Sequence, residues 1–119
     1  MSRIQKVAGL LKQEIGTIIQ TRLRDPRIGF VTVSDVTLTR DMRIANVYFT
    51  VLGDEDVAST LEGLEKARPF IQNELASRVR LRYLPVLRFF HDTSFEYGSR
   101  IEKLLKTLDH QEPETENGQ

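Results

Sequence analysis

Cysteine is absent from this sequence of 119 residues. Its absence excludes disulfide scaffolds, thiolate metal sites and cysteine nucleophiles, and it is compatible with a reducing cytosol. The length is typical of one domain, and the apolar and charged fractions are those of a soluble globular protein. Residues 1–6 lead into an amphipathic pattern that contains Gln13 and Glu14, which predicts neither a signal peptide nor a membrane span. We therefore expect a cytoplasmic protein that makes no use of a membrane.

Histidine is scarce, and residues suited to catalysis are correspondingly few. Of the two histidines, His110 lies close to the C-terminus and His91 stands next to Asp92. That pair could act as a base and its orienting group, but no nucleophile in a suitable context accompanies it. No histidine pair has the spacing of a metal site, and no two glycines have the spacing of a phosphate-binding loop. The sequence therefore favours a protein that is not an enzyme and needs no cofactor or metal, and a small hydrolase is poorly supported.

The net charge of zero hides an uneven distribution. Residues 109–119 contain four acidic residues and no lysine or arginine. Without those four, 17 basic residues stand against 13 acidic ones, which leaves a net charge of +4. Since residues 110–119 also lack apolar side chains, we expect a folded domain over 1–108 and an acidic disordered tail over 109–119.

Hydrophobic periodicity predicts a helix followed by a hairpin. Apolar residues recur at helical spacing over 2–23, with Ser2 as a plausible N-cap, and Pro26 follows the end of this pattern. Alternating patterns predict antiparallel strands over 30–38 and 43–51. The parity of the first strand changes part-way, so we expect a β-bulge near Ser34 and Asp35.

The second half of the chain reads as helix, strand and helix. Asp54 is a plausible N-cap for a helical pattern that Pro69 interrupts, which predicts either one kinked helix or two short ones around Ala67, Arg68 and Pro69. A strand is expected over 86–91 and a terminal helix over 95–108. The predicted fold class is α+β, a single domain with a three-stranded sheet and its helices on one face.

Three arginines alternate with aliphatic residues just before Pro85. If Arg78, Arg80 and Arg82 lie in an extended segment, their guanidinium groups share one side, whereas in a helix Arg80 would point away. A guanidinium group is always charged and matches phosphate geometry. The segment is either a set of solvated surface charges or part of a surface for a polyanion. Other basic residues that could contribute are Arg3 and Lys6 in the first helix and Lys66 and Arg68 at the kink, while Arg40 and Arg43 flank the hairpin turn and Tyr83 is an aromatic that could stack on a base.

Several strings resemble one family. They are TVSDVTL (32–38), DMRIANVY (41–48), RVRLRYLPVLRF (78–89) and DTSFEYGSRI (92–101), together with RIQKV (3–7) and DPR (25–27). The order α-β-β-α-α-β is that of a type II KH domain, and the strings resemble the ribosome-binding factor A family over roughly residues 3–105. The resemblance implies a KH-like fold that lacks the Gly-x-x-Gly loop and carries an Ala-x-Gly kink between its middle helices. At that position this sequence has Ala67-Arg68-Pro69, with proline in place of the glycine.

The resemblance also implies a function. Members are bacterial assembly factors that bind the immature small ribosomal subunit, assist late rRNA maturation including 5′-end processing, and matter for growth in the cold. It further suggests a monomer that a ribosome-associated GTPase helps to release. Without a Gly-x-x-Gly clamp, RNA binding should depend on shape and phosphate contacts. The alternative is a protein-interaction module that docks a partner through the hairpin and the kinked helix, with RNA binding incidental.

Overall fold

The computed structural model describes residues 2–53 and 56–94. The terminal helix, the acidic tail and Asp54 lie outside the described residues, so the predictions for the helix and the tail stay predictions. The elements, in chain order, are α1 (Arg3–Arg22), β1 (Val31–Leu38), β2 (Ile44–Val51), α2 (Val57–Arg78) and β3 (Val86–His91). Among the described residues, no helix combines the length and the apolar character needed to cross a membrane.

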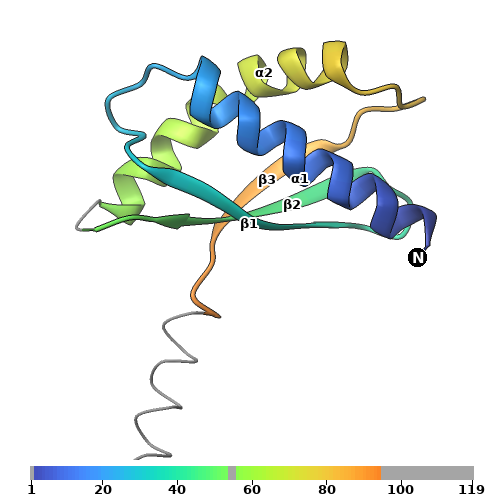
Figure 1. Ribbon diagram of the computed structural model, residues 1–119, viewed down its shortest axis with the longest axis horizontal. Coiled ribbons are helices and arrows are strands. Elements are labelled where there is room, and N and C mark those ends of the chain that lie inside the picture. The colour runs from blue at the N-terminus through green and yellow to red at the C-terminus, as the bar shows by residue number, and fades with distance from the viewer. Residues whose placement is uncertain (1, 54–55, 95–119) are drawn as a thin grey trace, which may run out of the picture.

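The three strands form one mixed sheet with both helices on one face (Figure 1). Strand β2 is central: β1 pairs with it antiparallel on one side, and β3 pairs with it parallel on the other. A parallel neighbour needs a long crossover, which α2 provides by running back across the sheet. The α+β fold with helices on one face is confirmed.

The core lies between the helices and the sheet. Ala45, Val47 and Phe49 alternate along β2 and are completely buried, as the period of two in the sequence predicts. From the helices, Ile15 and Leu75 are among the side chains that pack against them. Since the alternate residues of β2 point to the opposite face, the sheet buries only one of its two sides among the described residues.

Helix α1 begins with a capping box. The Ser2 hydroxyl accepts a hydrogen bond from the Gln5 backbone N–H at 3.1 Å, and the Gln5 side chain accepts one from the Ser2 backbone N–H at 3.0 Å. Two backbone donors that lack helical partners are satisfied in this way. The predicted N-cap is therefore confirmed.

The predicted bulge in β1 is also confirmed. Val33 pairs with Phe49 and Asp35 pairs with Tyr48, so Ser34 is the additional residue on β1. The bulge lets both Val33 and Val36 reach the core although their positions differ in parity.

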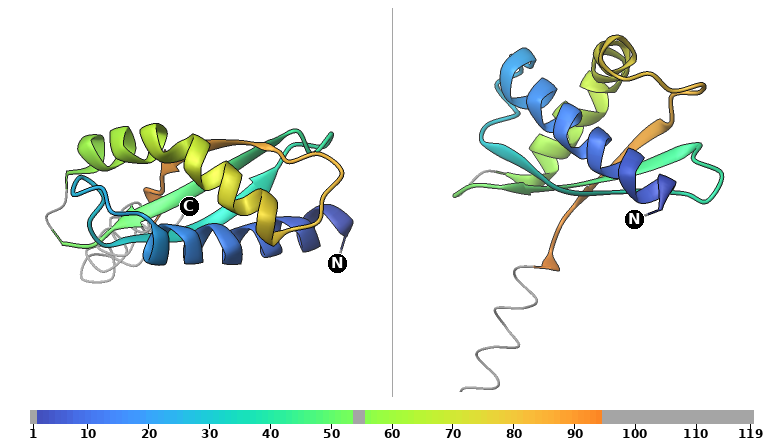
Figure 2. Two further views of the ribbon diagram at one scale, coloured as in Figure 1. Left: turned by 90° about the horizontal axis from the view of Figure 1, so that it is seen from above. Right: turned by 45° about the vertical axis from the view of Figure 1, so that its right-hand side comes forward.

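Helix α2 begins later than expected and is continuous. The prediction of Asp54 as its N-cap is wrong: the cap is Asp56, whose carboxylate accepts hydrogen bonds from the backbone N–H groups of Ala58 and Ser59. The alternative of two short helices is also wrong, because Pro69 lies inside one helix that changes direction near its middle (Figures 1 and 2). Proline cannot donate to the carbonyl of Glu65, and its ring crowds that carbonyl, so the helix bends without ending.

Strand β3 ends in a small polar network that joins it to β1. The Ser34 hydroxyl donates to the Asp92 carboxylate at 2.5 Å, and the Ser94 backbone N–H donates to the same carboxylate at 2.8 Å. These bonds, with the hydroxyl of Ser34 first, lower the pKa of Asp92 from 3.8 to about 2. The folded state therefore favours the ionised carboxylate.

We predict that Ser34→Ala raises the pKa of Asp92 toward 3.8. A carboxyl whose pKa is depressed by folding contributes its full stabilisation above its unfolded pKa and loses it as the pH falls toward about 2. The variant should therefore lose less stability than the parent between about pH 4 and about pH 2. An NMR titration of the Asp92 carboxyl carbon measures the pKa, and Thr93→Ala is the control, because Thr93 makes no hydrogen bond to Asp92 among the described residues. An unchanged Asp92 pKa in Ser34→Ala would contradict the assignment.

Candidate nucleic-acid interface

Three segments from distant parts of the chain meet at one end of the molecule. They are the start of α1, the β1–β2 turn and the loop between α2 and β3, which lie together in both views of Figure 2. The backbone N–H of Val86 donates to the carbonyl of Arg43 at 2.9 Å, which fixes the loop beside the turn. We call this surface the basic end and define it by six exposed side chains: Arg3, Lys6, Arg40, Arg43, Arg80 and Arg82.

The basic end carries a strong excess of positive charge. Residues 2–7, 39–43 and 79–85 contain those six cations and a single acidic residue, Asp41. The Asp41 carboxylate accepts hydrogen bonds from the Thr39 hydroxyl at 2.7 Å and from the Arg43 backbone N–H at 3.1 Å, and these bonds lower its pKa. Both bonds go to Oδ1, which thus helps to hold the turn, in which Met42 has a φ of 60°. The surrounding cations remain in excess, as a phosphate-binding surface requires.

The arginine segment changes from helix to extended chain at Arg78. Helix α2 ends there, and Val79 follows with φ −123° and ψ 149°. Beyond that point the alternation seen in the sequence holds: Val79 is buried and Leu81 packs against the core, while Arg80 and Arg82 are exposed. The Arg82 guanidinium lies 5.5 Å from the centre of the Tyr83 ring, so a planar cation and an aromatic ring stand together at the surface.

Arg78 differs from the two arginines that follow it. As the last residue of α2, it lies with its guanidinium 3.4 Å from the Glu14 carboxylate of α1 and 3.9 Å from the Glu74 carboxylate. Its side chain is 28% exposed. The pair with Glu14 ties α2 to α1, the pair with Glu74 lies within α2, and both partly neutralise Arg78.

We therefore predict that Arg78→Ala acts chiefly on stability. The loss of two partly exposed ion pairs should lower the free energy of unfolding by about 0.5–1 kcal/mol. The salt dependence of RNA binding should change less than when Arg80 is replaced. Urea denaturation measures the first quantity, and titrations at several salt concentrations measure the second. Equal effects of Arg78→Ala and Arg80→Ala on the salt dependence would contradict this division of roles.

The chain matches the family model described as "Ribosome-binding factor A" over residues 3–105. The chain belongs to the ribosome-binding factor A family. It is similar to the factor of Staphylococcus saprophyticus, with 50% identity over 107 residues that cover 89% of this chain and 94% of that protein. The factor of Staphylococcus carnosus is 49% identical over 107 residues, which cover 89% of this chain and 93% of that protein.

Solved structures of ribosome-binding factor A share the fold. The crystal structure of the factor from Thermus thermophilus superposes with a TM-score of 0.70 at 32% identity, covering 74% of this chain and 93% of that one. A homology model of the Thermus thermophilus factor, fitted into a cryo-EM map of a 30S–RbfA complex, superposes with a TM-score of 0.61 at 35% identity, covering 72% of this chain and 91% of that one.

Lys66 and Arg68 lie on the middle of α2, apart from the basic end of this family member. Arg68 is ten residues before the end of the helix, which corresponds to about 15 Å. Lys66 is exposed, whereas Arg68 forms an ion pair with Glu65 and its Nε is buried without a hydrogen-bond partner among the described residues. The structure thus separates these two candidates from Arg3, Lys6, Arg80 and Arg82, which it brings together.

Arg40 and Arg43 belong to the basic end, although the sequence places them only on either side of the hairpin turn. Their position on either side of a turn was visible, but sequence alone does not show which loop the turn meets. The pairing of Ile44 with Val86 brings that turn beside the arginine segment. By contrast, the arginines at the far end of α1 lie away from this surface, and Arg27 there is held by Asp25 and Glu62.

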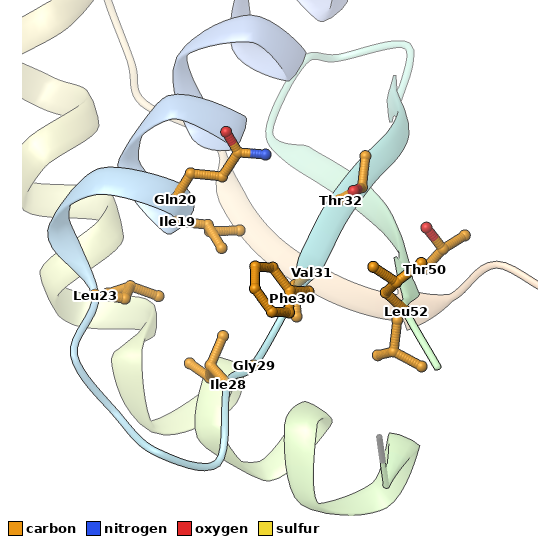
Figure 3. A pocket seen from close by; sticks show the side chains of 11 residues that line it. Ile19, Gln20, Leu23, Ile28, Gly29, Phe30, Val31, Thr32, Thr50 and Leu52 are labelled. Atoms are coloured by element: carbon orange, nitrogen blue, oxygen red, sulfur yellow. The ribbon is translucent and has the colours of Figure 1, made fainter. Parts of the chain in front are cut away.

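The opposite end of the molecule has a hollow of about 510 Å³, lined by apolar side chains and by the polar residues Gln20, Thr32 and Thr50 (Figure 3). Ile19 and Leu23 line it from α1, and Ile28 lines it from the loop that follows. At its rim, Phe30 is 74% exposed and Leu52 is 69% exposed. These two exposed side chains at the rim are suited to apolar contacts, in contrast to the basic end.

Proposed function

We propose that this protein binds the immature small ribosomal subunit through its basic end and assists late maturation of the subunit's rRNA, including 5′-end processing. Membership of the family supports the proposal, as does the relative in Thermus thermophilus, whose coordinates were fitted into a 30S complex. One observation supports the choice of this surface. Six exposed cations converge there, and the one acidic residue among them, Asp41, accepts a hydrogen bond within the turn. We place the protein in the cytoplasm, as a monomer.

The proposed action is stoichiometric and not catalytic. A rigid basic surface that binds one arrangement of an rRNA junction more tightly than another shifts the folding equilibrium of the subunit. Arg80 and Arg82 stand first among the proposed contacts, with Arg40, Arg43, Arg3 and Lys6 around them. Release by a ribosome-associated GTPase and a role in growth in the cold belong to the same proposal. Arg78, Lys66 and Arg68 form a second group whose contribution to binding should be smaller.

Sedimentation with purified subunits tests the proposed partner. Binding to immature small subunits should fall steeply between about 50 and about 200 mM salt, because neutralised phosphates release counterions. Depletion of the protein in cells should raise the ratio of precursor to mature small-subunit rRNA at the 5′ end. Normal 5′ ends after complete depletion, or no binding to immature subunits at low salt, would contradict the proposal.

A protein-interaction module is the second candidate, and the exposed Phe30 and Leu52 favour it. Docking through these apolar side chains should form a complex with one protein partner that is insensitive to salt. Phe30→Ser with Leu52→Ser separates the two functions. It should abolish such a complex and leave the salt-dependent binding to rRNA unchanged.

A further inference from the structure

One face of the sheet has no helix over it among the described residues (Figure 1). We call it the open face. It presents apolar and aromatic side chains from the neighbouring strands β2 and β3. Val86 is 48% exposed and Phe90 is 42% exposed, and the rings of Tyr48 and Phe90 stack with their centres 5.6 Å apart. Together with Ile44, these side chains form an apolar strip made of two cross-strand pairs, Ile44–Val86 and Tyr48–Phe90, with the polar pair Asn46–Arg88 between them.

The chain leaves the sheet on this same side. After β3, the Asp92 backbone N–H donates to the carbonyl of Phe49 on β2, and the Asp92 carboxylate reaches Ser34 on β1. The stretch that follows β3 therefore crosses toward β1, and Figure 1 and the right view of Figure 2 show it passing to the side away from both helices. Because Ser94 also bonds to Asp92, the direction of exit is fixed as far as residue 94.

The sequence that follows has the length and pattern to cover the strip. Its apolar residues Ile101, Leu104, Leu105 and Leu108 stand at i, i+3, i+4 and i+7, which is one face of an amphipathic helix. A helix over 95–108 would be about 21 Å long. The strands of the open face, with six and eight residues, are roughly 20–26 Å long.

We propose that residues 95–108 form a helix that docks on the open face, with these apolar side chains over Ile44, Tyr48, Val86 and Phe90. The charges on the open face favour this occupant over RNA. Arg88 is the one lysine or arginine that β1, β2 and β3 carry, while Asp35 and Asp92 lie beside the Tyr48–Phe90 pair. The segment is also tethered at Ser94, which gives it an effective concentration of roughly millimolar at the sheet.

With this helix docked, both faces of the sheet are covered by helices. It leaves the basic end as the main charged surface for rRNA, since the start of α1, the hairpin turn and the arginine segment remain uncovered by it. The inference does not depend on what the basic end binds, so it can fail or hold independently of the proposed function.

Methyl NMR on the full-length protein tests the inference. With a soluble paramagnetic agent, the methyl groups of Ile44 and Val86 should be protected in the parent protein. In Leu104→Ser with Leu105→Ser, their relaxation enhancement should rise at least twofold, while that of the core residue Ile71 stays unchanged. The control is Lys103→Ser with Lys106→Ser, which alters polar positions of the same segment and should leave Ile44 and Val86 protected.

Three results would overturn the inference. The first is that Ile44 and Val86 are as accessible in the parent as in the leucine variant. The second is protection that persists in the leucine variant. The third is protection that disappears on dilution, which would identify a second copy of the chain as the occupant. Each can be observed in the same spectra, without reference to rRNA binding.

Discussion

Replacing Arg80 and Arg82 together by alanine should weaken binding to small-subunit rRNA by about a hundredfold. Both side chains are exposed on an extended segment, and no ion pair engages them among the described residues. A charge-assisted contact with a phosphate is worth roughly 1.5 kcal/mol, and two such contacts correspond to about two orders of magnitude in affinity. The slope of log affinity against log salt concentration should become shallower by about 1.5–2.

The matched control is Arg22→Ala with Arg24→Ala at the opposite end of α1. It removes the same charge from the chain, so it corrects for a general change in electrostatic attraction. We expect it to reduce affinity only a few-fold. Equal losses in the two double variants, measured by titration at several salt concentrations, would contradict a localised binding surface.

Replacing Phe49 by alanine should lower the free energy of unfolding by about 3–5 kcal/mol. Phe49 is completely buried in the central strand and is among the largest side chains of the core. The loss would be a large part of the roughly 5–15 kcal/mol that stabilises a typical domain. Urea denaturation followed by far-ultraviolet circular dichroism measures it.

Phe30→Ala is the control for this variant, because it makes the same chemical change at a side chain that is 74% exposed. It should cost about 1 kcal/mol or less. Similar destabilisation by the two substitutions would contradict the arrangement in which β2 points Phe49 at the helices.

Local patterns in the sequence predicted the elements well where burial has a clear period. The helical spacing of residues 2–23, the alternation in the hairpin and the change of parity at Ser34 each reflect one buried face. The predicted N-cap of α2 was wrong because two nearby residues satisfy the same local preference. Asp54 and Asp56 are both suitable N-caps, and only the position of the first helical turn distinguishes them.

Relations between distant residues could not be read from these patterns. Nothing local to Arg78 indicates that Glu14, 64 residues earlier, lies 3.4 Å from it and partly neutralises its charge. The parallel pairing of β3 with β2 likewise depends on the path of α2 across the sheet. That pairing places the hairpin turn beside the arginine segment, so the basic end is a product of the fold.

The central claim is that rRNA contacts the basic end of this protein. A photo-reactive benzophenone amino acid in place of Tyr83, which is exposed beside Arg82, reports directly on that surface. The same group in place of Phe30 reports on the opposite end. After irradiation of complexes with immature small subunits, position 83 should cross-link to rRNA at discrete nucleotides and position 30 should not. Cross-links to rRNA from position 30 with none from position 83 would contradict the account.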